Sequence, residues 1–178
     1  MKNPSAVPLA LILGGMIAAQ TGLASGEKTN RAGSIDKAPA ACPVTAPSNP
    51  PFSPPPPYPA KPSSTGSFWH GTAALWTELQ VNGTWPGLPH NADGFTQKVF
   101  WWRPGFDGRT EPQPNLTVFG RRLDGSESFM REPPATNAYL GDLGWAILTG
   151  IDLPTTGCWE ISGQYRGGSV KFVVWVAP

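Results

Sequence analysis

The sequence predicts an all-β protein with the layout of an antiparallel β-sandwich, and three observations predict it. Beyond Ser67, short apolar stretches alternate between apolar and polar residues with a period of two, as half-buried strands do. Gly, Pro, Asn and Asp end these stretches at regular intervals. No segment keeps a helical period for the ten or so residues that a helix needs. Short strands joined by such turns are typical of a two-layer sandwich.

The alternation and the turns place the expected strands in chain order. They cover residues 73–81, 97–103, 116–119, 145–153, 158–165 and 169–176. The turns contain Asn82-Gly83, Pro104-Gly105, Asp124-Gly125, Pro154 and, in a tight hairpin, Arg166-Gly167-Gly168. The last strand is apolar on nearly both faces. We therefore expect it to lie centrally in its sheet or to have its outer face covered.

The chain begins with the pattern of a cleavable secretory signal peptide, which we place at residues 1–25. Lys2 precedes an apolar stretch from about Ala6 to Ala19, and mostly small residues follow it. A membrane span needs about 20 predominantly apolar residues, so this stretch is too short. An uncleaved N-terminal anchor is the alternative. Because each later apolar run is broken by a charge, Gly or Pro, we expect an exported mature chain that is periplasmic, cell-surface or secreted.

Two segments of distinct composition separate the signal peptide from the sandwich, which we place at residues 67–178. Residues 26–41 are small, polar and mildly charged, so we expect them to be disordered. Residues 42–66 are rich in proline, which favours the extended polyproline II conformation. This segment is a stiff spacer, a ligand for proline-reading domains, or a strap along the sandwich.

Cys42 and Cys158 are the only cysteines of the chain. In an oxidising compartment an isolated pair most often forms a disulfide, which we expect here. Its loop of more than about 100 residues would contribute about 4 to 5 kcal/mol by the chain-entropy estimate. The bond would make residues 42–66 a strap rather than a tether. A lipidated Cys42 and a thiol nucleophile are the alternatives, and neither has the expected sequence context.

Charge and motifs argue against several classes of function. The 13 Lys and Arg and the 12 Asp and Glu are scattered, so we expect no nucleic-acid partner. The motifs of a serine-hydrolase elbow, a zinc protease, a phosphate loop and a calcium loop are absent, so we expect no cofactor, no metal and no enzyme activity. Two alternatives stay open. His70 and His90, both in loop-like sequence, could meet as metal ligands, or could act with Glu78 or Glu160 in a hydrolase.

Tryptophan is the informative excess, with 8 residues. Neighbours on a strand face opposite ways, so Trp101 and Trp102 cannot enter the same core: one is exposed, or the sheet is covered on both sides. We expect about five or six indoles in the core and two or three at the surface, where they can stack on sugars or polymers. The candidate binding residues, including the outward-facing member of that adjacent pair, are Trp76, Trp85, Trp101, Trp102, Arg103 and Arg109.

Four motifs together resemble a group of exported bacterial proteins that have no assigned activity. They are Cys42-Pro43-Val44-Thr45, His70-Gly71 with Leu75-Trp76, Gly120-Arg121-Arg122-Leu123-Asp124, and Gly157-Cys158-Trp159-Glu160-Ile161-Ser162-Gly163. In that group the first and last motifs each carry a cysteine, which the resemblance implies are paired. Thr72 departs from the Asn usual there. The closing hairpin is similar to the end of immunoglobulin-like and fibronectin-like bacterial modules, which implies an immunoglobulin-like sandwich and no particular function.

These observations favour an exported, non-catalytic module of the cell envelope or exterior. We expect it to bind a cell-wall glycan or an envelope protein through exposed aromatic side chains. A structural envelope protein without a specific ligand is the alternative, and a hydrolase with a Glu and His site is a distant one.

Overall fold

The computed structural model of the protein describes residues 37–178. The signal peptide expected at residues 1–25, and residues 26–36 of the segment expected to be disordered, lie outside this range. The strands are β1 (Ser67–Gly71), β2 (Trp76–Gln80), β3 (Thr84–Trp85), β4 (His90–Asn91), β5 (Gly94–Trp102), β6 (Thr117–Arg122), β7 (Ser128–Arg131), β8 (Thr136–Tyr139), β9 (Trp145–Leu153), β10 (Gly157–Tyr165) and β11 (Gly168–Val176). One turn of 3-10 helix, η2 (Gly141–Leu143), precedes β9.

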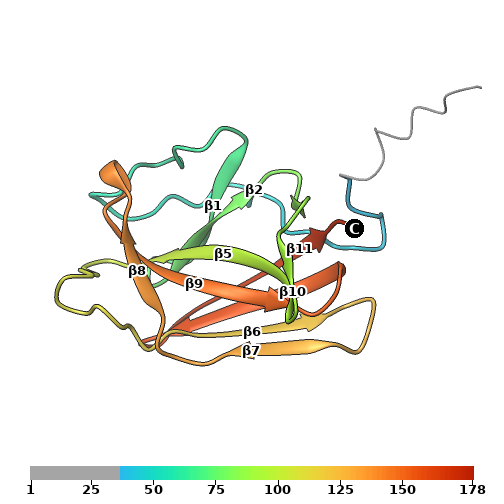
Figure 1. Cartoon of the computed structure of the whole chain (residues 1–178). Helices are drawn as coiled ribbons and strands as arrows, with labels where there is room; N and C mark the ends of the chain where they lie inside the picture. The colour runs from blue at the N-terminus through green and yellow to red at the C-terminus, as the bar shows by residue number, and fades with distance from the viewer. Residues whose placement is uncertain (1–36) are drawn as a thin grey trace, which may run out of the picture. The chain divides into compact units, whose positions relative to one another are not determined.

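The strands form two sheets that pack face to face (Figure 1). The first sheet has the order β1-β2-β5-β9-β8, with β4 paired to the far end of β5. The second sheet has the order β3-β11-β10-β6-β7. All pairs are antiparallel except β3 with β11, which run parallel. The prediction of an all-β sandwich is therefore confirmed.

The expected strands agree with the observed ones where the alternation is long. The strand expected at residues 145–153 has those bounds in the structure, and β10 and β11 each begin one residue early. The last strand lies between β3 and β10 and so is not at the edge of its sheet, although β3 pairs with only its last two residues and its outer face is exposed or half-buried. The sequence missed β1, β3, β4, β7 and β8, which are 2 to 5 residues long and too short to show a period.

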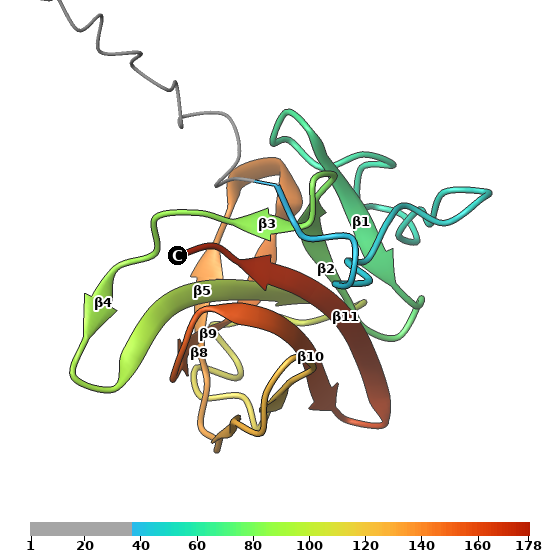
Figure 2. The same cartoon turned by 90° about the vertical axis from the view of Figure 1, so that its right-hand side faces the viewer.

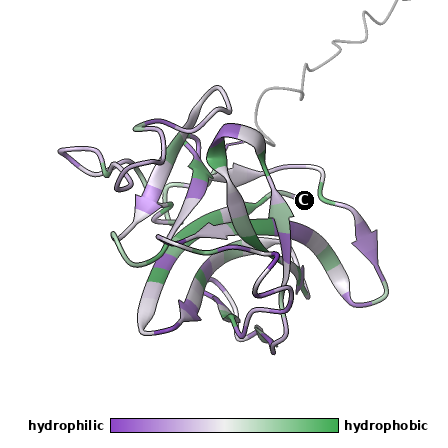
Figure 3. Ribbon diagram, turned by 90° about the vertical axis from the view of Figure 1, so that its left-hand side faces the viewer, coloured by the Kyte–Doolittle hydropathy of each residue, from purple (hydrophilic) through white to green (hydrophobic). Residues whose placement is uncertain are grey.

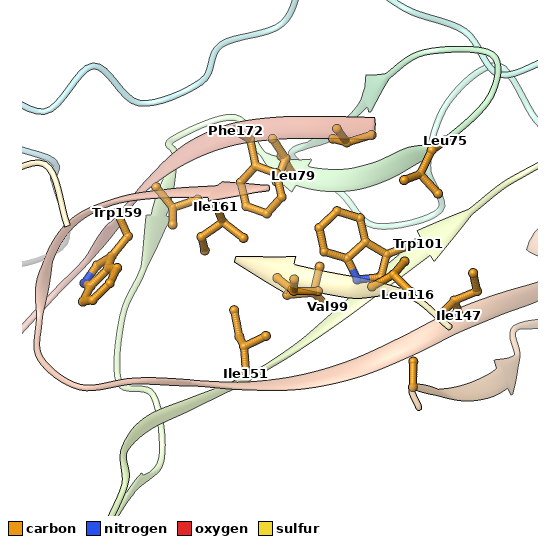
Figure 4. Close-up of a cluster of buried hydrophobic side chains, with 14 of the residues drawn as sticks. Leu75, Leu79, Val99, Trp101, Leu116, Ile147, Ile151, Trp159, Ile161 and Phe172 are labelled. Atoms are coloured by element: carbon orange, nitrogen blue, oxygen red, sulfur yellow. The ribbon is translucent and has the colours of Figure 1, made fainter. Parts of the chain in front are cut away.

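The main core lies between the two sheets and contains apolar side chains from both. Trp101 of β5 is fully buried at its centre, near Phe172 of β11 at a ring distance of 5.9 Å (Figure 4). Its indole N–H donates to Thr149 Oγ1 at 2.9 Å, so the buried polar atom is satisfied. In Figure 3 hydrophobic residues are concentrated on the strands, whereas the loops are largely hydrophilic.

A second apolar layer covers the outer face of the first sheet. Its buried members are Trp69, Trp76, Trp102, Leu143 and Ala146. Phe52 and Tyr58 of the proline-rich segment pack against it, and the ring of Tyr58 lies 4.9 Å from that of Trp76. The first sheet is therefore covered on both sides, which is why the adjacent residues Trp101 and Trp102 are both buried.

The proline-rich segment is attached to the sandwich at several points. A disulfide joins Cys42 to Cys158 at the start of β10, as predicted. Tyr58 Oη donates to the carbonyl of Arg103 at 2.9 Å, and the indole of Trp69 donates to the carbonyl of Pro59 at 3.0 Å. In Figure 2 the segment runs beside β3 and β11 and then continues past β1 and β2. The segment is not extended throughout, because the N–H of Tyr58 closes a turn onto Pro55.

Within residues 37–178, no helix has the length and apolar character needed to cross a bilayer.

Candidate functional site

The candidate site is a cleft between β2 and β5, where two neighbouring strands of the first sheet separate. They pair only at Trp76 with Trp102 and at Thr77 with Trp101. Beyond this point β2 continues to Gln80 without a partner on β5. The separation follows from the next step of the chain, since β3 leaves the first sheet and pairs with β11 of the second. The two diverging strands therefore leave an opening at the surface of the sandwich.

Two adjoining depressions form the cleft. One, of about 250 Å³, is lined among others by Glu78, Gln80, Gln97, Lys98 and Phe100. The other, of about 330 Å³, shares Ser64, Glu78 and Phe100 with it and extends to Trp102, Leu140 and Leu143. One end of the cleft is thus polar and charged, and the other end is apolar.

Side chains take the place of strand partners along the cleft. The hydroxyl of Thr77 donates to the carbonyl of Phe100 at 2.8 Å. The N–H of Lys98 donates to Oε1 of the neighbouring Gln97 at 2.9 Å. Short local bonds of this kind satisfy backbone groups that a continuous ladder would otherwise pair.

Glu78 is the most unusual polar residue of the cleft. It is half-buried on β2, and its Oε1 is shielded from solvent without a hydrogen-bond partner among residues 37–178. Leaving a buried polar atom unpaired is unfavourable by about 1 to 3 kcal/mol, and by more for a charged group. Because Glu78 lines both depressions, a rotation of its carboxylate would offer this oxygen to a donor on a ligand.

The indoles expected to bind at the surface are buried. The exposed fraction is 0% for Trp76 and Trp101, 1% for Trp102 and 8% for Trp85. The expectation of a surface position is therefore wrong for Trp76 and Trp85, and for the adjacent pair the sheet is covered on both sides. Trp76 and Trp102 belong to the outer layer that the strap joins, whereas Trp85 and Trp101 lie in the main core between the sheets. Trp85 and Trp102 do line the cleft from beneath, whereas the other two do not. A binding role for these four residues stays a prediction, and their burial leaves little indole surface that a ligand could contact.

The partly exposed indoles are Trp145 and Trp175, which the sequence did not single out. Trp145 packs edge to face with the 64% exposed ring of Tyr139 at 5.3 Å. The sequence also missed Lys98 and Phe100 of the cleft. The one available signal was the polar run of residues 96–98 inside an otherwise apolar strand.

The two candidate arginines lie outside the cleft. Arg109 forms an ion pair with Asp107 at 2.6 Å. The hydrogen bond from Arg109 lowers the pKa of the Asp107 carboxyl to about 2. Arg103 lies beside the ring of Tyr165, with its guanidinium carbon 5.5 Å from the ring centroid.

The histidines do not join the glutamates. Both histidines lie in strands rather than loops, which corrects the expectation. The ring of His70 is bonded through Nε2 to the carbonyl of Lys171 at 2.8 Å. His70 is opposite Thr77, one residue before Glu78, so its side chain lies on the other face of the sheet from the Glu78 carboxylate.

Glu160 lies in the second sheet, where Arg121 donates a hydrogen bond to its carboxylate at 2.8 Å and lowers its pKa. No group of three potential metal ligands occurs in the part of the chain that the structure describes.

No protein-family model, curated protein or solved structure matches the chain. Of the resemblances noted in the sequence, the two-sheet β-sandwich is the part that the structure shares.

Proposed function

We propose that the protein is an exported, non-catalytic binding module of the cell envelope or exterior, and that its ligand is a glycan bound in the cleft between β2 and β5. The observation that carries the proposal is the unpaired Oε1 of Glu78 at the edge of that cleft. Saccharide hydroxyls donate to carboxylates and amides, and the apolar faces of sugar rings pack on aromatic rings. The cleft offers both, because Gln80 and Gln97 stand beside Glu78 and the partly exposed Phe100 lies between its two ends.

We further propose that the sandwich is immunoglobulin-like. In that fold strands A, B, E and D form one sheet and C, F and G the other, with C′ beside C in variable-type domains. The orders β2-β5-β9-β8 and β7-β6-β10-β11 fit this arrangement. Three features differ: β1 is added at one edge, β3 pairs parallel with β11, and the disulfide attaches the strap to β10 instead of joining the two sheets. The fold by itself implies no activity.

The disulfide supports an oxidising setting outside the cytoplasm, because such bonds are rare where thiols are kept reduced. We propose a periplasmic, cell-surface or secreted location.

The test is a titration of the exported chain, followed by two-dimensional NMR of its backbone amides, against a panel of cell-wall glycans and envelope extracts. We expect one glycan class to shift the amides of Lys98 and Phe100. Glu78→Gln and Phe100→Ala should weaken that binding, while Met130→Ala, at an exposed position of the second sheet, should not. No shift with any glycan would overturn the proposal. A shift of these amides with a protein of the extract alone would replace the glycan by a protein ligand.

A structural envelope protein without a ligand is the second candidate. Burial of Trp69, Trp76, Trp85, Trp101, Trp102 and Trp159 favours it, because packing then accounts for most of the tryptophan excess. If this alternative holds, Glu78→Leu removes an unpaired buried oxygen and should cause no loss of function.

A further inference from the structure

We propose a second binding site, for a ligand that carries a carboxylate or phosphate group, between the end of β5 and the β10–β11 turn. A depression of about 260 Å³ lies there, and Arg103, Asp107, Thr110, Glu111, Tyr165 and Arg166 are among its lining residues. This site shares no lining residue with the cleft and does not depend on the function proposed for it.

Arg166 occupies a backbone conformation that its residue type disfavours. Its φ is 45°, and it is the only non-glycine residue with a positive φ in residues 37–178. It stands with Gly167, at φ 81°, in the tight hairpin between β10 and β11, where Asn, Asp or Gly is the usual first residue. The turn alone therefore does not account for an arginine. Side chains held in such conformations are concentrated at binding sites.

The guanidinium of Arg166 is directed at the same ring as that of Arg103. Each has its central carbon 5.5 Å from the centroid of the Tyr165 ring. Arg166 also forms an ion pair with Glu111 at 2.8 Å. The geometry thus holds two cationic groups beside one aromatic side chain at the wall of a polar depression.

Arg103 has hydrogen-bond donors to spare. No carboxylate lies within ion-pairing distance of it in the described part of the chain, and the bond from its Nε to the carbonyl of Pro104 is long, at 3.4 Å. Of the charged residues that line the depression, Arg166 is paired with Glu111 and Asp107 is paired with Arg109 from outside the lining, which leaves Arg103 without a carboxylate partner. A ligand carboxylate or phosphate supplies the missing charge and fits the fork of donors on a guanidinium.

Tyr165 positions the arginines through its ring. The residue is 3% exposed, and its hydroxyl has no hydrogen-bond partner among residues 37–178. Burial raises the pKa of Tyr165 to about 12, and the nearby Glu111 adds to the rise without reaching good hydrogen-bonding geometry. The hydroxyl is therefore neutral at ordinary pH, and the ring face is what the two guanidinium groups contact.

The test uses galacturonate, glucose 6-phosphate and neutral glucose as probes at constant ionic strength, with the arginine Nε–H signals followed by NMR. We expect saturable shifts of the Arg103 and Arg166 signals with at least one anionic sugar and none with glucose. A response to galacturonate alone identifies a carboxylate ligand, and a response to glucose 6-phosphate alone a phosphate ligand. Equal shifts with sodium chloride, or no shift with either anionic sugar, would overturn the proposal.

Matched variants separate binding from stability. Arg103→Ala and Arg166→Gly should each weaken binding of the responding probe at least tenfold, while Arg131→Ala, which removes the same charge from β7, should leave it unchanged. Because glycine accepts a positive φ, Arg166→Gly should melt at the same temperature as the unaltered protein or higher. Tyr165→Phe keeps the ring and should keep the affinity. If Arg131→Ala weakens binding as much as Arg103→Ala, the effect is one of net charge and the site is disproved.

Discussion

Thr45 and Val173 lie 128 positions apart in the chain and exchange two hydrogen bonds. The N–H of Thr45 donates to the carbonyl of Val173 at 2.9 Å, and the N–H of Val173 donates to the hydroxyl of Thr45 at 2.7 Å. Further along the same edge of β11, the N–H of Trp175 donates to the carbonyl of Gly83 at 2.8 Å. The strap and β3 thus cover an edge that would otherwise present free backbone groups to other chains.

Replacement of Thr45 by Val should destabilise the protein by about 1 to 3 kcal/mol, because it leaves the N–H of Val173 without its acceptor. Thr45→Ser keeps the hydroxyl and should lose much less. Urea unfolding followed by tryptophan fluorescence measures both free energies. Equal losses in the two variants would show that the hydroxyl does not serve this N–H.

The disulfide should supply a large part of the stability. Its two cysteines are separated by 116 positions, and removal of a native disulfide typically costs about 2 to 5 kcal/mol. We expect the Cys42→Ala, Cys158→Ala double variant to unfold at lower urea, with the unaltered protein in reductant behaving alike. Mass spectrometry of the native protein, with and without reduction, checks the bond directly, and two free thiols would contradict it.

The sequence was most informative where a pattern is local. The alternation in β9, β10 and β11 runs for 9 residues in each strand, long enough to place all three. The burial of Trp102 could not be predicted in this way. Trp102 lies against Trp69 of β1, and its indole donates to the carbonyl of Leu143, in a cluster that residues 52 and 58 of the strap also join. No periodicity connects these segments to Trp102. The cleft could not be predicted for a similar reason. It depends on the pairing of β3 with β11 of the second sheet instead of with β5 of the first.

Asp124 should make the protein more sensitive to acid. Burial raises the pKa of its carboxyl, but hydrogen bonds from Arg122 at 2.8 Å and from the N–H of Cys158 at 3.0 Å lower it by more, so the net pKa is lowered. A carboxyl with a lowered folded-state pKa stabilises the protein above its unfolded-state value, and this contribution is lost as the pH falls through the folded-state pKa.

We therefore expect Asp124→Asn to reduce stability at neutral pH and to flatten the decline of stability below about pH 4. Urea unfolding at a series of pH values measures the slope for both proteins. Parallel curves for the variant and the unaltered protein would show that Asp124 titrates alike in the folded and unfolded states.

Gly163 of β10 should be unable to accept a side chain without displacing the main core. A Cβ built at this position would lie 2.5 Å from Cζ3 of Trp101 and 2.7 Å from its Cη2. Trp101 is fully buried and its indole N–H is bonded to Thr149, so the ring cannot move aside without breaking that bond. We expect Gly163→Ala to destabilise the protein by about 1 to 3 kcal/mol, as overpacking in a core does.

Gly150 of β9 is the matched control, because nothing lies within 4 Å of the Cβ that Gly150→Ala would add. That change should be neutral or slightly stabilising. Differential scanning calorimetry compares the two variants, and a similar melting temperature for both would show that the Trp101 ring is not confined against β10.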